Sequence, residues 1–111
     1  RIQYNLHMVI YVDIDETICY TNYTKNLDGK FDYNSSEPIP ENIEKINKLY
    51  DGGNMIIYWT SRAVTKQKTD NWFQLTLNQL KEWGCKFHEL RMGKPHYDVF
   101  ICDKTKRIEE V

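Results

Sequence analysis

The chain has 111 residues, of which 41% are hydrophobic and 14% are aromatic, so it can bury one packed core. Fifteen Lys and Arg residues stand against sixteen Asp and Glu residues, which gives a formal net charge of −1. This balance excludes a globally basic surface for nucleic acid or for an anionic membrane. The composition also excludes a disordered chain and predicts a single domain over residues 1–111.

The apolar runs, the first residues and the cysteines of the chain predict its cellular compartment. The longest apolar run, Met8–Val12, is far shorter than the ~20 residues that a membrane-spanning helix needs. Residues 1–7 lack the pattern of a signal peptide, and we expect them to precede a natural start at Met8. The cysteines are odd in number and widely spaced, as is typical of reduced thiols in a cytoplasmic protein: Cys19, Cys85 and Cys102.

Four segments have the apolar, β-branched and aromatic composition of buried strands. The first two are Met8–Val12 and Asn54–Trp59, the third and weaker one is Cys85–Leu90, and the fourth is Val99–Cys102. Continuous apolar runs are typical of strands whose two faces are both covered, as in a parallel sheet. Several of these segments stop at a polar residue, which indicates a site at the carboxyl ends of the strands.

Two amphipathic helices are predicted between these strands. The first spans Pro38–Tyr50 and is followed by Gly52. The second spans Asp70–Trp83, with Asp70 as N-cap and Gly84 just beyond its end. The alternation of strands and helices predicts an α/β fold, a small Rossmann-like parallel sheet flanked by helices.

The polar stretch of residues 16–37 lies between the first strand and the first helix. It holds an Asp28-Gly29 turn signal and a short strand signal over Lys30–Tyr33. We therefore expect a small hairpin flap over the site and no separate cap domain. The tyrosines of this stretch serve either to stack on a ligand ring or to pack the flap itself: Tyr20, Tyr23 and Tyr33.

Asp13 and Asp15 follow the first strand directly. Residues two apart in an extended segment point to the same side, so both carboxylates can enter one space. Two close carboxylates repel each other unless a cation or a proton compensates their charge. Oxygen ligands suit Mg²⁺, and one carboxylate can stay charged while the other carries a proton. The alternative is a pair of solvated loop aspartates, which the strongly apolar run before them disfavours.

The segment Val12–Thr17, V-D-I-D-E-T, resembles the first motif of the haloacid dehalogenase (HAD) superfamily, a hydrophobic strand followed by D-x-D-x-T. Three further segments resemble its other motifs in the same order: Tyr58–Ser61, Gly93–Pro95 and Phe100–Asp103. The resemblance spans about 95 residues. Within the superfamily, the chain resembles small phosphatases with a minimal cap that are associated with surface-polysaccharide genes.

The resemblance implies a phosphatase of the HAD type that hydrolyses a phosphate monoester through an aspartyl-phosphate. Asp13 would attack phosphorus, and Asp15 would act as general acid and then general base. The residues that would hold the phosphoryl oxygens are Thr60, Ser61 and Lys94. The ligands of Mg²⁺ would be Asp13, Asp15 and Asp103. The expected partner is a small phosphorylated metabolite such as a sugar phosphate, although the phosphate end of a nucleic acid stays open.

Two features depart from this pattern. Cys102 stands where many relatives carry a second acid, and a thiol is a poor ligand for Mg²⁺. Only residues 91–98 separate the third and fourth predicted strands, whereas parallel crossovers need a dozen or more residues. Because this connection is short, Arg62 and Lys104 are alternative candidates to Lys94 for the basic residue that holds the phosphate. Two other classes stay open, a receiver-like phosphoacceptor signalling domain and a catalytically silent HAD-like binding module.

Overall fold

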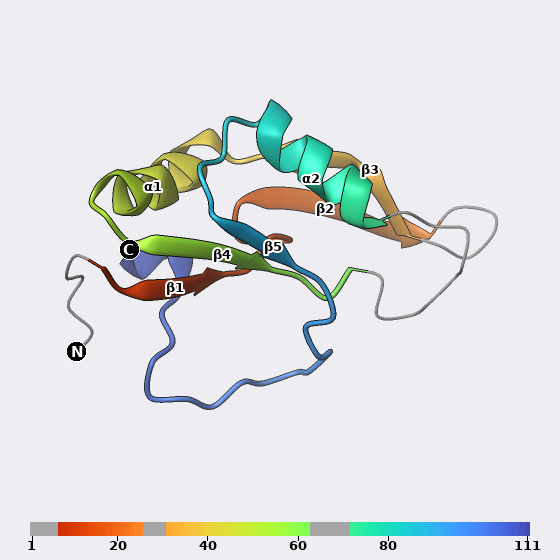
Figure 1. Cartoon of the computed structure of the whole chain (residues 1–111). Coiled ribbons are helices and arrows are strands. Elements are labelled where there is room, and N and C mark those ends of the chain that lie inside the picture. Colours follow the sequence, from red (N-terminus) through yellow and green to blue (C-terminus); the bar gives the residue numbers. More distant parts are fainter. Residues whose placement is uncertain (1–6, 26–30, 63–71) are drawn as a thin grey trace.

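The computed structural model describes residues 7–25, 31–62 and 72–111 (Figure 1). Within these ranges, the elements in chain order are β1 (Val9–Val12), β2 (Cys19–Lys25), β3 (Phe31–Pro38), α1 (Pro40–Asp51), β4 (Met55–Trp59), α2 (Trp72–Glu82), β5 (Glu89–Arg91) and the 3₁₀ helix η1 (Ile108–Glu110). The architecture is the predicted α/β class, a small Rossmann-like parallel sheet flanked by helices.

The parallel sheet has the strand order β1-β4-β5, with β4 in the centre. Val12 pairs with Tyr58, and Tyr58 pairs in turn with Leu90, so the carboxyl ends of the three strands lie at one edge of the sheet. We call this the carboxyl edge. The two strong strand predictions, Met8–Val12 and Asn54–Trp59, are confirmed to within one residue at each end.

The third strand is shorter than predicted, because only Glu89–Arg91 of this part of the chain is in the sheet. The backbone N–H of Cys85 still bonds to a carbonyl in the last turn of α2. Contact with β4 begins at His88, whose N–H donates to the Ile56 carbonyl over 2.9 Å. The His88 ring continues this contact, since its Nδ1 accepts the Ile56 N–H over 3.1 Å.

Both predicted α-helices are present, and they lie on the same side of the sheet (Figure 1). Pro40 is the first residue of α1. The N–H groups of the first helical turn have no partner within the helix, so a proline there costs no helical hydrogen bond. Gly84 follows α2 with a φ of 75°, a left-handed conformation that glycine adopts readily. The predicted N-cap Asp70 lies outside the described residues. The helices bury their apolar faces against the sheet, and the core side chains include Ile43, Ile46, Ile56, Tyr58, Leu80 and Leu90.

The predicted flap is an antiparallel hairpin of β2 and β3, and its strands are longer than the predicted Lys30–Tyr33. The predicted Asp28-Gly29 turn lies outside the described residues. At the base of the hairpin, the Ile39 N–H donates to the Ile18 carbonyl over 2.8 Å, and the Ile18 side chain is fully buried. The hairpin is therefore anchored in the core, and it takes the place of a cap domain in the described part of the chain.

The prediction of a fourth strand over Val99–Cys102 is wrong. This segment has no regular secondary structure, and the exposed fractions of its three apolar residues are 73%, 51% and 93% for Val99, Phe100 and Ile101. A further parallel strand would require the chain to return along the whole sheet, and residues 91–98 are too short for that crossover. Consequently β1 is an outer strand of the described sheet, and Asp103 does not follow a strand of that sheet.

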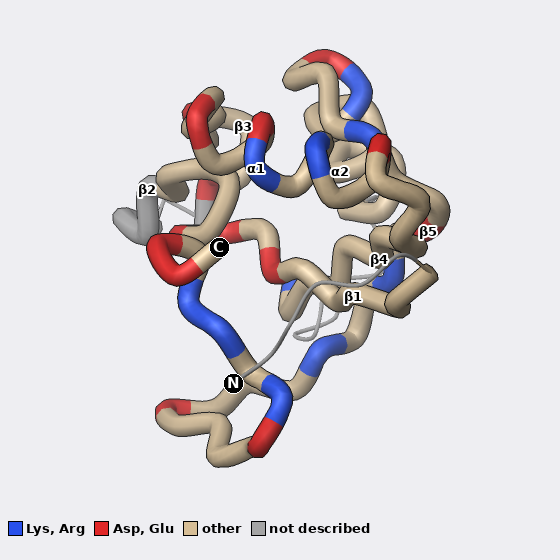
Figure 2. The backbone as a smooth tube through the Cα atoms, turned by 90° about the vertical axis from the view of Figure 1, so that its left-hand side faces the viewer, with Lys and Arg blue, Asp and Glu red and all other residues tan. Residues whose placement is uncertain are grey.

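Lys and Arg residues are interspersed with Asp and Glu residues along the backbone (Figure 2). This distribution agrees with the near-neutral composition. None of the helices in the described ranges is both long enough and apolar enough to cross a bilayer.

Candidate active site

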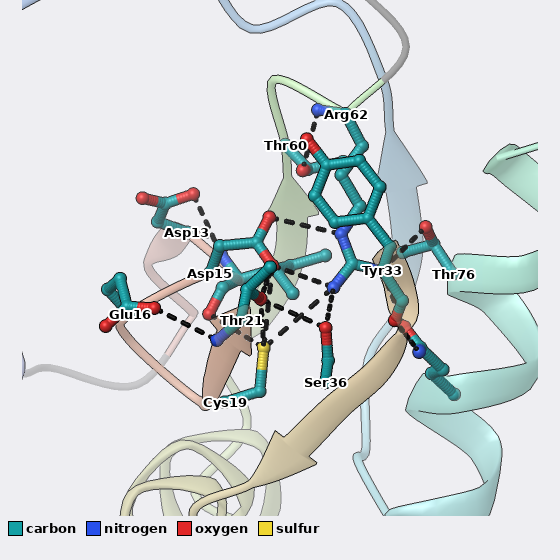
Figure 3. Close-up of polar contacts among 12 residues, drawn as sticks. Asp13, Asp15, Glu16, Cys19, Thr21, Tyr33, Ser36, Thr60, Arg62 and Thr76 are labelled. Carbon is teal, nitrogen blue, oxygen red and sulfur yellow. Dashed lines mark hydrogen bonds and ion pairs between the residues drawn. The ribbon is translucent and has the colours of Figure 1, made fainter. Parts of the chain in front are cut away.

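A tight turn after β1 places the two aspartates (Figure 3). The Ile18 N–H donates to the Ile14 carbonyl over 2.9 Å, and both isoleucine side chains are fully buried. Glu16 occupies the corner with a φ of 62°, a conformation that is uncommon for a residue with a side chain. Because Ile14 points into the core, Asp13 and Asp15 on either side of it point away from the core, at the carboxyl edge.

The Asp13 carboxylate lies beside Lys94. One oxygen accepts the Ile14 N–H over 2.8 Å, and the other is 3.5 Å from the Lys94 Nζ. The Asp13 side chain is 41% exposed, whereas that of Lys94 is only 12% exposed. Partial burial raises the pKa of the Asp13 carboxyl group, and the positive charge of Lys94 opposes this shift. The site therefore presents an accessible carboxylate next to a fixed ammonium group.

The Asp15 carboxylate is held by Arg62. The Arg62 Nε donates to one oxygen over 3.1 Å, and its Nη2 donates to the other over 2.8 Å. The Thr21 hydroxyl also donates to Asp15. The Arg62 side chain is completely buried and that of Asp15 is 14% exposed. A forked pair of this kind fixes both side chains, and the guanidinium compensates the negative charge of Asp15.

Arg62 joins three parts of the fold. Its guanidinium donates to Thr76 over 3.1 Å and to Gln79 over 2.6 Å, both on α2. It donates to Ser36 of β3 over 3.3 Å and lies 4.7 Å above the centre of the Tyr33 ring. The flap, α2 and the turn after β1 therefore meet at one buried cation. From its place in the sequence, Arg62 was expected only as an alternative to Lys94, and its pairing with Asp15 was not predicted.

Thr60 lies at the end of β4, as its position after an apolar run predicts. Its side chain is completely buried, and its hydroxyl oxygen accepts the Arg62 N–H over 3.1 Å. The same hydroxyl retains its own proton, which it can donate. Ser61 is partly buried and its hydroxyl donates to the Pro95 carbonyl over 3.4 Å, so it contacts the segment after β5.

Backbone contacts explain how Lys94 reaches the site without a fourth strand. The Thr60 N–H donates to the Arg91 carbonyl, and the Lys94 N–H donates back to the Thr60 carbonyl, each over 3.0 Å. These bonds hold the chain after β5 against the end of β4. The Lys94 Nζ also lies 5.9 Å from the centre of the Trp59 ring and 5.4 Å from that of Tyr97.

The predicted metal ligands are not assembled. Asp103 is exposed and contacts the thiol of Cys102, and no three His, Cys, Asp or Glu side chains among the described residues form a group that could hold a metal. The reason is that Val99–Cys102 does not pair with β1. Asp15 is already occupied by Arg62, so Asp13 is the accessible carboxylate. One carboxylate is nevertheless compatible with Mg²⁺, which commonly binds through one or two of them together with substrate phosphate and water.

The comparisons with known proteins concern the fold alone. No protein-family model matches the chain, and no curated protein matches it. The chain is similar to the crystal structure of an MCSG target from Vibrio cholerae, with a TM-score of 0.74 and 21% sequence identity over 93% of this chain and 85% of that chain. At this identity the similarity concerns the fold, which is Rossmann-like.

Proposed function

We propose that the chain is a phosphatase of the haloacid dehalogenase type that hydrolyses a phosphate monoester, with Asp13 as nucleophile. One observation carries this proposal. Asp13 is an accessible carboxylate at the carboxyl edge of a parallel sheet, and the Lys94 ammonium lies 3.5 Å from it. The ammonium group would attract the phosphate dianion and stabilise the charge that develops on its oxygens.

In the first step, the Asp13 carboxylate attacks phosphorus and the bond from phosphorus to the leaving oxygen breaks. The product is an aspartyl-phosphate, which splits one difficult displacement into two easier ones. Lys94 and the hydroxyl of Thr60 are the proposed donors to the phosphoryl oxygens. In the second step, water attacks phosphorus, Asp13 leaves as a carboxylate, and inorganic phosphate is released.

Asp15 is proposed to manage the proton in both steps, because the leaving oxygen gains a proton and the attacking water loses one. The forked pair with Arg62 compensates the negative charge of Asp15. The proton that Asp15 takes from water is then available to the leaving group of the next substrate, so the cycle balances.

Mg²⁺ is proposed as the cofactor. When bound, the ion compensates the charge between an anionic nucleophile and an anionic substrate. The residue that would hold it is Asp13, together with the backbone carbonyl of Asp15, the substrate phosphate and water. Asp103 has no part in this arrangement, since it lies in the exposed segment after Val99–Cys102.

A small phosphorylated metabolite, such as a sugar phosphate, is the proposed substrate class. A cytoplasmic location is proposed on the basis of the cysteines, which are unpaired in the described part of the chain: Cys19, Cys85 and Cys102. A second candidate is a catalytically silent phosphate-binding module. It is favoured by the occupation of both Asp15 oxygens by Arg62.

The proposal is tested by the hydrolysis of p-nitrophenyl phosphate in the presence of Mg²⁺. We expect Asp13→Asn to abolish turnover, because an amide oxygen is a poor nucleophile. Asp51→Asn is the matched control, because Asp51 also pairs with a lysine, Lys86, at 2.8 Å but lies on the exposed surface of α1. Turnover that survives Asp13→Asn contradicts the proposal. Wild-type protein that binds phosphate without turnover favours the silent module.

A further inference from the structure

A pocket of about 260 Å³ adjoins Lys94. Besides the lysine, it is lined by apolar and aromatic residues: Trp59, Pro95, Tyr97, Val99, Phe100 and Ile101. Liquid water occupies about 30 Å³ per molecule, so the pocket has room for a group of the size of one ring. Lys94 also lines the larger hollow that contains Asp13. The pocket and the hollow that contains Asp13 therefore share Lys94, the residue proposed to hold the phosphate.

The aromatic side chains that line this pocket pack against other rings. The Trp59 ring packs edge-on against Tyr11, with ring centres 5.6 Å apart. On the other side, Tyr97 and Phe100 pack with ring centres 5.4 Å apart. Lys94 lies near both groups of rings, because its Nζ is within 6 Å of the ring centres of both Trp59 and Tyr97. The lining thus combines one ammonium group with aromatic rings.

We propose that this pocket receives the leaving group of the substrate and that the leaving group contains a ring with a flat apolar face. This inference rests on the proposed phosphatase function. Under this proposal the first atoms of the leaving group lie beside Trp59 and Tyr97, because both rings lie near the Lys94 ammonium group that would hold the phosphate. Ring faces stack favourably on aromatic side chains. A ring-free leaving group that carries hydroxyl groups would lose its hydrogen bonds to water in this pocket. The apolar lining would offer few hydrogen bonds in return.

Kinetics on pocket variants test the inference. Tyr97→Ala and Phe100→Ala remove one wall in a segment without regular structure, and their matched control is Phe73→Ala on the exposed face of α2. The three rings are 48%, 51% and 46% exposed, respectively. The substrates are phenyl phosphate, glucose 6-phosphate and the ring-free glycerol 3-phosphate.

We expect both pocket variants to raise KM about threefold to tenfold for at least one of the two ring substrates, with little change for glycerol 3-phosphate. The ring substrate with the larger loss identifies the leaving group as aromatic or as a sugar. Phe73→Ala should leave all three KM values unchanged. Equal changes for ring and ring-free substrates, or no change for either ring, overturn the inference.

Binding without turnover separates this inference from the proposed function. Phenylphosphonate and methylphosphonate carry a phosphorus–carbon bond that a phosphatase does not hydrolyse. Calorimetry should show tighter binding of phenylphosphonate by the wild-type protein and loss of this preference in Tyr97→Ala. This result in a protein without turnover would retain the pocket and refute the phosphatase. Turnover with equal affinity for the two phosphonates would retain the phosphatase and refute the pocket.

Discussion

The buried pair of Arg62 and Asp15 gives the most demanding prediction. Arg62→Met removes the guanidinium but keeps much of the volume of the side chain. The Arg62 side chain is completely buried and Asp15 is 14% exposed, so the variant leaves a nearly buried carboxylate without its partner. Breaking a buried pair in this way costs about 3–5 kcal/mol of the free energy of unfolding. The lost hydrogen bonds to Thr76 and Gln79 act in the same direction.

For a chain of this size, a loss of about 3–5 kcal/mol corresponds to a fall of roughly 12–25 °C in the unfolding midpoint. Circular dichroism during heating measures the midpoint, and urea titration measures the free energy. Arg62→Lys should recover only part of the loss, because an ammonium group cannot reproduce the fork. The control is Arg91→Met, which breaks the exposed pair with Glu89 and should leave the midpoint close to that of the wild type.

Replacing both partners tests the cause of the loss. In the double variant Arg62→Met with Asp15→Leu, the unpaired charge is absent, so much of the stability should return. If Arg62→Met were no less stable than Arg91→Met, the account of Arg62 as the residue that joins the flap, α2 and the turn after β1 would be refuted.

Three further predictions follow from the site. Asp15→Asn should lower kcat about 10²–10⁴-fold and accumulate phosphoenzyme, seen as a burst of p-nitrophenol, because the base for the second step is lost; slow turnover without a burst would contradict this role. Cys102→Asp should leave the affinity for Mg²⁺ unchanged in calorimetry, since residue 102 is exposed and belongs to no group of metal-binding side chains among the described residues; tighter binding would show that the segment reaches the metal. Iodoacetamide at pH 8 should modify Cys102 and spare Cys19, because burial, aided by the charge of Asp15, raises the pKa of the Cys19 thiol to about 12; mass spectrometry that finds Cys19 modified first would refute this.

The elements that the sequence predicted well are those whose local pattern determines them. The apolar runs that became β1 and β4 and the helical spacing in α1 need no information from distant residues. Val99–Cys102 has the same local pattern but forms no strand, because an apolar, β-branched segment also needs a neighbouring strand within reach. The short connection over residues 91–98 decided the outcome, and it was visible in the sequence as a conflict.

The site was predictable only in part, for a related reason. Asp13 and Asp15 follow a predicted strand directly, so their place at the carboxyl edge follows from the pattern. The partners of Arg62 come from the flap and from α2, and no local spacing indicates that these elements converge on it. No pattern in a single sequence indicates that the Arg62 side chain is buried. Lys94 reaches Asp13 through backbone bonds to Thr60, a route that motif order alone does not describe.

The most direct test of the central claim is to locate the phosphoryl group during turnover. Asp15→Asn protein is mixed with p-nitrophenyl phosphate and Mg²⁺, quenched in acid within milliseconds and digested, and the peptides are analysed by mass spectrometry. The account predicts a phosphoryl group on the peptide that carries Asp13, at the Asp13 side chain. Turnover with no covalent phosphoryl group, or with the group on another residue, would contradict it.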